Sequence, residues 1–97
     1  MKTIKLSDFG ENLGTRFVGE LVRKAIDEAL LGSEPVEVDF SGVTRVTHSF
    51  ADEVFGSLTR DLGPDIFRTR LKVVGISTDI QALLRFVVLE RTRRPTH

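Results

Sequence analysis

The chain has 97 residues, of which 40% are hydrophobic and 29% are charged, proportions typical of one soluble globular domain and too few residues for two. Lys plus Arg and Asp plus Glu both number 14, which argues against a general attraction to nucleic acid or to an anionic membrane. Cysteine is absent, which excludes disulfides, thiolate nucleophiles and the common zinc sites and fits a reducing compartment.

No segment has the pattern of an export signal or a membrane span. Residues 1–10 lack the apolar run of about 7 to 15 residues that a secretory signal needs. No stretch reaches the roughly 18 apolar residues of a transmembrane helix. We therefore expect a cytoplasmic protein that does not bind membranes.

The first half of the chain predicts a strand, a long helix and a second strand. Residues 3–6 form a short edge strand that ends in a turn at Ser7 to Gly10. Residues 14–31 form an amphipathic helix that stops at Gly32. Its apolar positions are Phe17, Val18, Leu21, Val22, Ala25, Ile26, Ala29 and Leu30. Residues 36–40 alternate as a strand does, with Val36, Val38 and Phe40 on one face.

The second half repeats this order. After β-rich residues 43–47, Ser49 and Asp52 have the spacing of a capping box, which predicts a helix from Ser49 to about residue 62. Residues 71–76 form a nearly all-apolar strand, and Ser77 or Thr78 caps a final helix. The inward stripe of this helix comprises Ile80, Leu83, Leu84, Val87 and Val88, and Phe86 and Leu89 lie outside the stripe. Residues 85–91 fit either a wide helix face or a short strand, and we favour helix; residues 91–97 form a basic tail that we expect to fray.

Strands that alternate with helices imply crossover connections, and these give a largely parallel sheet. We predict one α/β domain over residues 1–97. The expected core contains the residues that lie on the apolar faces of their elements, namely Phe17, Leu21, Val36, Val38, Phe40, Phe55, Val73 and Val74.

The central segment, VEVDFSGVTRVTHSFADEVFGSL at residues 36–58, resembles the motif of STAS domains, the fold of bacterial anti-anti-sigma factors. It is most similar to a STAS-like family of bacterial domains of unassigned function, in which SF-x-DE replaces the DSSG turn of those antagonists. The Gly14-Thr15-Arg16 opening of the first helix and the later LKVVGI strand add to the resemblance. The resemblance implies a small, mostly parallel or mixed sheet of about four strands with helices packed on it.

The resemblance also implies a site and a partner. Ser49 falls where the antagonists carry their phosphorylatable serine, Thr47 where they carry an aspartate, and Phe50 where they carry a glycine. The implied role is that of a non-catalytic regulatory module whose Ser49 turn binds a protein of the histidine-kinase-like ATPase fold. Two other roles stay open: a sensor that binds a nucleotide or lipid-like molecule at the strand ends, and a homo-oligomeric unit joined through Phe86 and Leu89.

Each candidate residue also has a structural interpretation. Ser49 is either a phosphoacceptor or only an N-cap. Asp52 and Glu53 either contact a partner or complement the helix dipole. Asp39 lies at the end of the central strand, where it either binds a ligand or forms an Asx turn, and His48 is either a surface contact, pH-sensitive or not, or a passive exposed side chain.

We expect no enzymatic activity, no metal and no cofactor. His48 and Ser49 are neighbours that should point apart, with no third group and no GxSxG elbow. No glycine-rich phosphate loop occurs. The arginines at the third strand and in the tail have no aromatic side chains between them, so we interpret them as a solvated surface and not as a nucleic-acid site; they are Arg68, Arg70, Arg91, Arg93 and Arg94.

Overall fold

The computed structural model describes residues 1–92, and a three-stranded parallel sheet lies at its centre. β3 (Val36–Asp39) lies between β1 (Lys2–Lys5) and β5 (Leu71–Val74). In the register of the sheet, Val36 lies beside Lys2 on one strand and Leu71 on the other. A second, two-stranded parallel sheet joins β2 (Asn12–Leu13) to β4 (Arg45–Val46). The predicted α/β fold with a small, mostly parallel sheet is confirmed.

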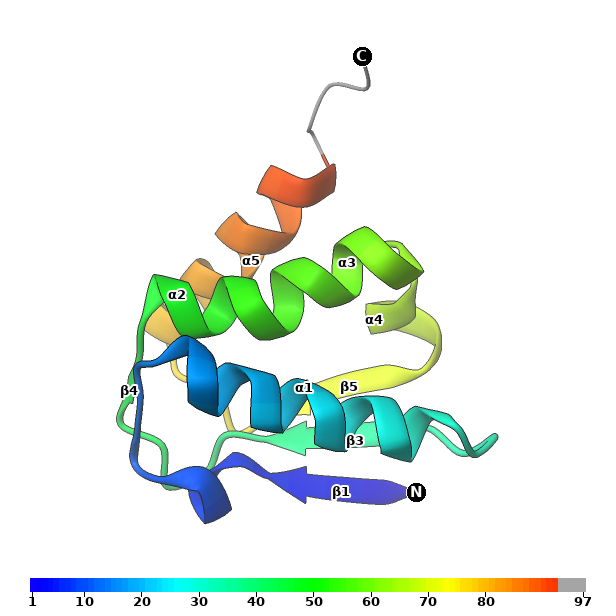
Figure 1. Cartoon of the computed structure of the whole chain (residues 1–97), viewed down its shortest axis with the longest axis horizontal. Coiled ribbons are helices and arrows are strands. Elements are labelled where there is room, and N and C mark those ends of the chain that lie inside the picture. The colour runs from blue at the N-terminus through cyan, green and yellow to red at the C-terminus, as the bar shows by residue number, and fades with distance from the viewer. Residues whose placement is uncertain (93–97) are drawn as a thin grey trace.

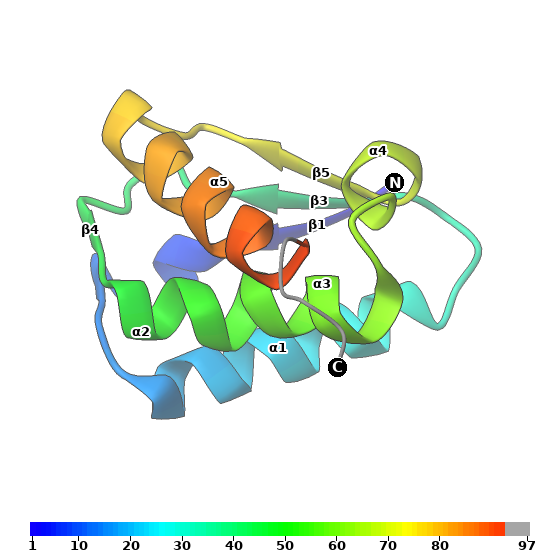
Figure 2. The ribbon, with the colours of Figure 1, turned by 90° about the horizontal axis from the view of Figure 1, so that it is seen from above.

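The longer helices all lie on one face of the three-stranded sheet (Figures 1 and 2). α1 (Arg16–Leu30) connects β2 to β3, and α5 (Thr78–Thr92) follows β5. Between them, α2 (His48–Ala51), the π-helical turn η2 (Asp52–Gly56) and α3 (Ser57–Leu62) run on as one rod. Two short helices complete the chain, the 3-10 helix η1 (Leu6–Phe9) and α4 (Ile66–Thr69). Among residues 1–92, no helix is both long enough and apolar enough to cross a membrane.

Strand alternation explains why only one face of the sheet is covered. Val36 and Val38 of β3 are buried against the helices, whereas Glu37 and Asp39 between and after them are only half-buried. In the parallel register, Lys5 lies beside Asp39 and Lys72 lies beside Glu37, so these side chains share the same outer face. The uncovered face of the sheet is therefore mostly polar.

The core forms where the sheet meets the α2–α3 rod. Phe40 and Phe55 stack with ring centroids 5.9 Å apart, and Phe50 is fully buried beside them in the same cluster. The predicted core positions Val36, Val38, Phe40 and Phe55 are confirmed, and Val73 is half-buried against the cluster. Val74 is also half-buried, but its register partner is Asp39, which places it on the outer face.

Besides Val74, which lies on the outer face, two predicted core positions on α1 are wrong. Phe17 and Leu21 are 68% and 44% exposed, although α1 is the predicted amphipathic helix. The reason is Gly19, where an added Cβ would lie 2.9 Å from Cβ of Glu53. This close approach of α1 to η2 turns Val22 and Ile26 inward and leaves Phe17 and Leu21 about half a turn away, on the solvent side.

The C-terminal helix settles the alternatives for residues 85–91, which are helical throughout. The backbone N–H of Ile80 donates to the hydroxyl of Ser77 over 3.2 Å, so Ser77 is the cap. Frayed structure was predicted from residue 91, but Arg91 and Thr92 belong to α5. Residues 93–97, the rest of the predicted basic tail, lie outside the described residues.

Candidate functional site

Thr47, and not Ser49, caps the helix of the central motif. Thr47 has an extended backbone (φ −91°, ψ 163°) and its hydroxyl accepts a hydrogen bond from the N–H of Phe50 over 3.2 Å. The same hydroxyl donates to the carbonyl of Gly14 over 3.1 Å. Because an N-cap needs a non-helical backbone, and the helix has already begun at His48, Ser49 cannot fill that position. The predicted capping box is therefore wrong by two residues.

The Gly14-Thr15-Arg16 segment brings the N-terminus of α1 beside the N-terminus of α2, which Thr47 caps. Thr15 caps α1 by accepting from the N–H of Val18 over 3.2 Å. Arg16 then reaches across to η2, with its NH1 atom 3.3 Å from Glu53 Oε1 and 3.9 Å from Asp52 Oδ2. The two segments, far apart in sequence, thus form one junction.

Asp52 and Glu53 form ion pairs with arginines of the same domain. Arg91 of α5 holds Asp52 through Nε and NH2 over 3.1 to 3.2 Å, and both side chains are less than a fifth exposed. Gly56 makes room for this pair, because a Cβ there would collide with Oδ1 of Asp52 and would lie 3.4 Å from Nε of Arg91. Two acids and two arginines leave no net charge here, which favours the structural interpretation of Asp52 and Glu53.

Phe50 is also internal. Its side chain is fully buried, because the third residue of α2 faces the sheet. The predicted partner contact at Phe50 does not fit this burial, because the side chain has no surface exposed to a partner in the folded domain. A phenylalanine at this position belongs to the core.

His48 and Ser49 remain at the surface. The His48 ring lies 5.8 Å from the ring of Phe86, and its Nε2 lies 3.7 Å from Oε1 of Glu90. Ser49 is half-buried and lies one turn before Asp52 and Glu53 on the same side of the helix. Phe86 and Leu89 are 52% and 51% exposed, as their place outside the apolar stripe predicts. We call His48, Ser49, Phe86, Leu89 and Glu90 the α2–α5 surface.

Asp39 lies apart from this surface, at the end of β3. Its carboxylate accepts a hydrogen bond from the N–H of Ser41 over 2.9 Å, the arrangement of an Asx turn. The hydrogen bonds from Ser41 hold the pKa of Asp39 below its usual value. Gly75, with φ of +68°, packs against the turn so closely that an added Cβ would lie 2.5 Å from Ser41 Oγ and 2.6 Å from Asp39 Oδ1.

The arginines noted in the sequence serve the fold where the structure describes them. Arg70 donates from NH2 to the carbonyls of Leu30, Gly32 and Glu34 at 2.6 to 3.2 Å, which secures the end of α1 and the loop after it. Arg68 pairs with Asp65 at the surface. Arg93 and Arg94 lie outside the described residues.

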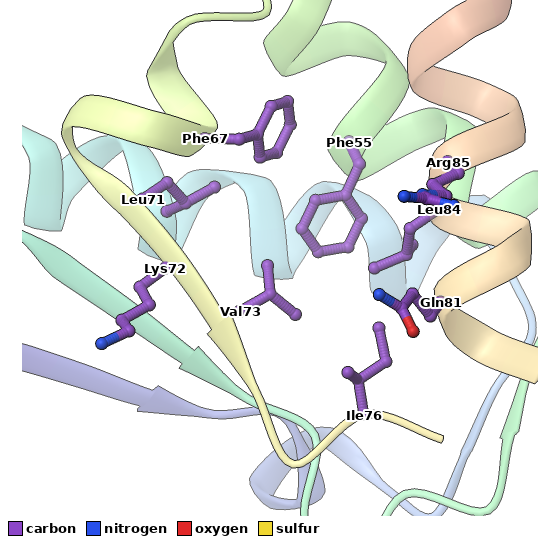
Figure 3. A pocket seen from close by; sticks show the side chains of 9 residues that line it. All are labelled: Phe55, Phe67, Leu71, Lys72, Val73, Ile76, Gln81, Leu84 and Arg85. Carbon is purple, nitrogen blue, oxygen red and sulfur yellow. The ribbon is translucent and has the colours of Figure 1, made fainter. Parts of the chain in front are cut away.

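His48 and Ser49 do not form a nucleophile–base pair in the described residues. His48 and Ser49 are consecutive helical residues, so their side chains leave the axis about 100° apart, and no hydrogen bond joins them in residues 1–92. Over the same residues, no three His, Cys, Asp or Glu side chains gather as metal ligands would. A cavity of about 380 Å³ lies between β5, α4 and α5, and neither Asp39 nor Ser49 lines it (Figure 3).

Residues 14–81 match the model of the family described as a STAS-like domain of unknown function (DUF4325). The chain belongs to this family. The matched range holds both helix N-termini of the junction and continues through β5 into the start of α5. No curated protein and no solved structure is similar enough to count as a match.

Sequence reasoning missed three residues that shape the site of this STAS-like domain: Arg16, Arg91 and Thr47 as the cap. Arg16 carries a detectable signal, because it follows Thr15 in the GTR segment that resembles the family. Arg91 carries none, since its partner Asp52 is 39 residues away. The sequence marks Thr47 only by its place in the antagonist motif, which does not indicate a cap.

Proposed function

We propose that this STAS-like domain is a non-catalytic regulatory module that binds another protein through the α2–α5 surface. The observation that carries the proposal is the exposure of Phe86 and Leu89, each about half exposed, beside the first turn of α2. Exposed aromatic and aliphatic side chains that adjoin polar ones are typical of protein-binding surfaces. His48 and Glu90 supply the polar groups at this place.

Ser49 is the proposed phosphoacceptor within this surface. A phosphate adds a charge of about −1.5 to −2, and Asp52 and Glu53 one turn later would repel it if they were unpaired. Both acids are paired, however, and Arg16 is more than half exposed. Its guanidinium can therefore turn from Glu53 toward a phosphate on Ser49, which would loosen the contact between α1 and η2. The likeness to anti-sigma antagonists suggests a histidine-kinase-like ATPase as the partner.

Affinity capture from lysate of the source cells, followed by quantitative mass spectrometry, tests the proposal. The bait is the wild-type domain, and the test variants are Phe86→Ser and Ser49→Asp. Phe17→Ser is the matched control, because Phe17 is an exposed helical phenylalanine on α1 that lies outside the α2–α5 surface. We expect a protein partner whose recovery falls at least tenfold with the two test variants and changes less than twofold with the control.

The other roles have their own outcomes in the same experiment. A partner lost with Phe17→Ser but kept with Phe86→Ser would contradict the proposed surface. Recovery of only the domain itself would favour a homodimer joined through Phe86 and Leu89. Copurification of a small molecule with no protein partner would favour the sensor role at the strand ends.

A further inference from the structure

An apolar cavity borders the free edge of β5 and has no part in the proposed function. Its volume is about 380 Å³. Apolar side chains of the rod, α4, the strand and α5 form its walls, and two polar side chains of α5 stand at its rim. The lining comprises Phe55, Phe67, Leu71, Lys72, Val73, Ile76, Gln81, Leu84 and Arg85. Figure 3 shows Phe67, Leu84 and Gln81 pointing into the space, while Lys72 points away from it.

The backbone of β5 offers hydrogen bonds along this cavity. Toward β3, the carbonyls of Arg70 and Val74 accept from Val36 and Phe40 over 2.8 and 2.9 Å. Because backbone groups alternate in direction along a parallel strand, those of Leu71 and Val73 face away from β3. Among residues 1–92, β5 is the last strand of its sheet and pairs with no strand on this side, so these groups lie on an unpaired edge.

The two edges of the sheet differ in how they are protected. β1, at the opposite edge, has Lys2 and Lys5 at its ends, and edge lysines are a common defence against unwanted strand pairing. β5 reads Leu-Lys-Val-Val, and its lysine lies on the outer face. An unprotected edge beside an apolar cavity is typical of sites where a peptide adds as a further strand.

The positive charge of Arg85 at the rim of the cavity indicates which kind of peptide would fit. Arg85 is exposed and forms no ion pair with any side chain of residues 1–92. Gln81, one turn earlier on α5, presents its amide toward the cavity (Figure 3). A guanidinium with free donors favours a carboxylate. The rim therefore suits an acidic residue next to the apolar side chain that fills the cavity.

We propose that β5 binds an extended, acidic segment of a partner protein as an added strand, with one large apolar side chain in the cavity and a carboxylate beside Arg85. A small apolar carboxylate would fill the cavity but would leave the backbone of Leu71 and Val73 bonded to water. An extended peptide would both fill the cavity and form hydrogen bonds with the backbone of Leu71 and Val73. This surface shares no residue with the α2–α5 surface, so the inference stands without the proposed function.

Selection from a displayed library of random dodecapeptides tests the inference, with the full chain as the target. We expect enriched peptides that alternate apolar residues and contain at least one acid. The best of them, made synthetically, is then titrated against paired variants. Gln81→Trp fills the cavity, and Ala82→Trp places the same side chain at the next exposed position of α5 outside the lining. Arg85→Glu reverses the rim charge, and Lys24→Glu makes the same change on the exposed side of α1.

We expect Gln81→Trp and Arg85→Glu to weaken the peptide at least tenfold, and their controls to change affinity less than twofold. The amides of Leu71 and Val73 should exchange with solvent more slowly when the peptide is bound, as a new strand requires. No enriched peptide, equal affinity for all four variants, or unchanged amide exchange would each overturn the inference. Phe86→Ser should leave the peptide affinity unchanged, so failure here is distinguishable from failure at the α2–α5 surface.

Discussion

Thr47 joins two helices through one hydroxyl. We predict that Thr47→Ala lowers the free energy of unfolding by about 1 to 2 kcal/mol, because it leaves the N–H of Phe50 and the carbonyl of Gly14 without their partner. Ser49→Ala should cost about 0.5 kcal/mol or less. Thr47→Ser, which keeps the hydroxyl, is the control for the methyl group. Urea melts measure all three, and a larger loss for Ser49→Ala than for Thr47→Ala would contradict the capping geometry.

Gly75 provides a second test of a single residue, since it combines a left-handed backbone with close packing against the Asp39 turn. Gly63 has a similar φ of +85° but open space around it. Alanine at either position should cost about 1 to 3 kcal/mol for the positive-φ backbone conformation. Only Gly75→Ala should cost a further amount of about 1 to 3 kcal/mol for the collision. If denaturant melts gave equal losses of unfolding free energy for Gly75→Ala and Gly63→Ala, the Asp39 turn would be able to move away from the added methyl group at no cost.

The sequence predicts residue types at this scale better than residue roles. A hydroxyl before the helix was expected, and two were present within three positions. The choice between Thr47 and Ser49 depends on Gly14, whose carbonyl the Thr47 hydroxyl reaches across 33 residues. The role of Asp52 likewise depends on a residue of another element, Arg91 of α5. Such choices follow from tertiary contacts that no local pattern contains.

At the scale of elements, one ion pair fastens the end of α5 to η2. The side chains of the Asp52–Arg91 pair are less than a fifth exposed, whereas those of the Asp65–Arg68 pair are 79% and 78% exposed. We predict that Arg91→Gln lowers the free energy of unfolding by about 1 to 3 kcal/mol, because it leaves a partly buried carboxylate without a charge partner. Arg68→Gln should change it by about 0.5 kcal/mol or less.

A double-mutant cycle with Asp52→Asn isolates the pair itself. The coupling between Arg91→Gln and Asp52→Asn should be about 1 to 2 kcal/mol. A coupling near zero in denaturant melts would show that solvent screens this pair as it screens surface pairs.

The element scale also shows what periodicity leaves undecided. Apolar residues cover so much of α1 that the repeat predicts a helix without fixing which side faces the sheet. Gly19 decides the orientation by letting η2 approach closely. The sequence does not reveal this role of Gly19, because a glycine inside a helix ordinarily only lowers the stability of the helix. The π-helical turn over Asp52–Gly56 also has no mark in the local sequence pattern.

At the scale of the molecule, alternating strands and helices correctly predicted a parallel α/β domain. The alternation could not divide the strands into sheets of three and two, because β2 and β4 are too short to show a pattern. The cavity beside β5 was also out of reach, since side chains of four elements line it. Order along the chain therefore predicts the architecture, and the surfaces have to be read from the assembled fold.

Phe40 and Phe17 differ in burial, and their replacement by alanine should differ in its effect on stability. Phe40 is buried against Phe55, so Phe40→Ala should lower the free energy of unfolding by about 3 to 5 kcal/mol. Phe17 is exposed, and Phe17→Ala should change it by about 0.5 kcal/mol or less. Denaturant melts of the two variants measure the difference. Similar losses would show that α1 is rotated relative to the described structure.

The proposed function assigns partner binding to the α2–α5 surface and makes Ser49 its switch. Isothermal titration of the captured partner with the wild type, Ser49→Ala and Ser49→Asp tests it most directly. Ser49→Ala adds no charge and should bind as the wild type does. Ser49→Asp should bind at least tenfold more weakly, a loss of about 1.4 kcal/mol, because a carboxylate changes the charge that the partner meets and competes with Glu53 for Arg16. Equal affinity for all three proteins would contradict the claim and leave Ser49 as an ordinary residue in the first turn of α2.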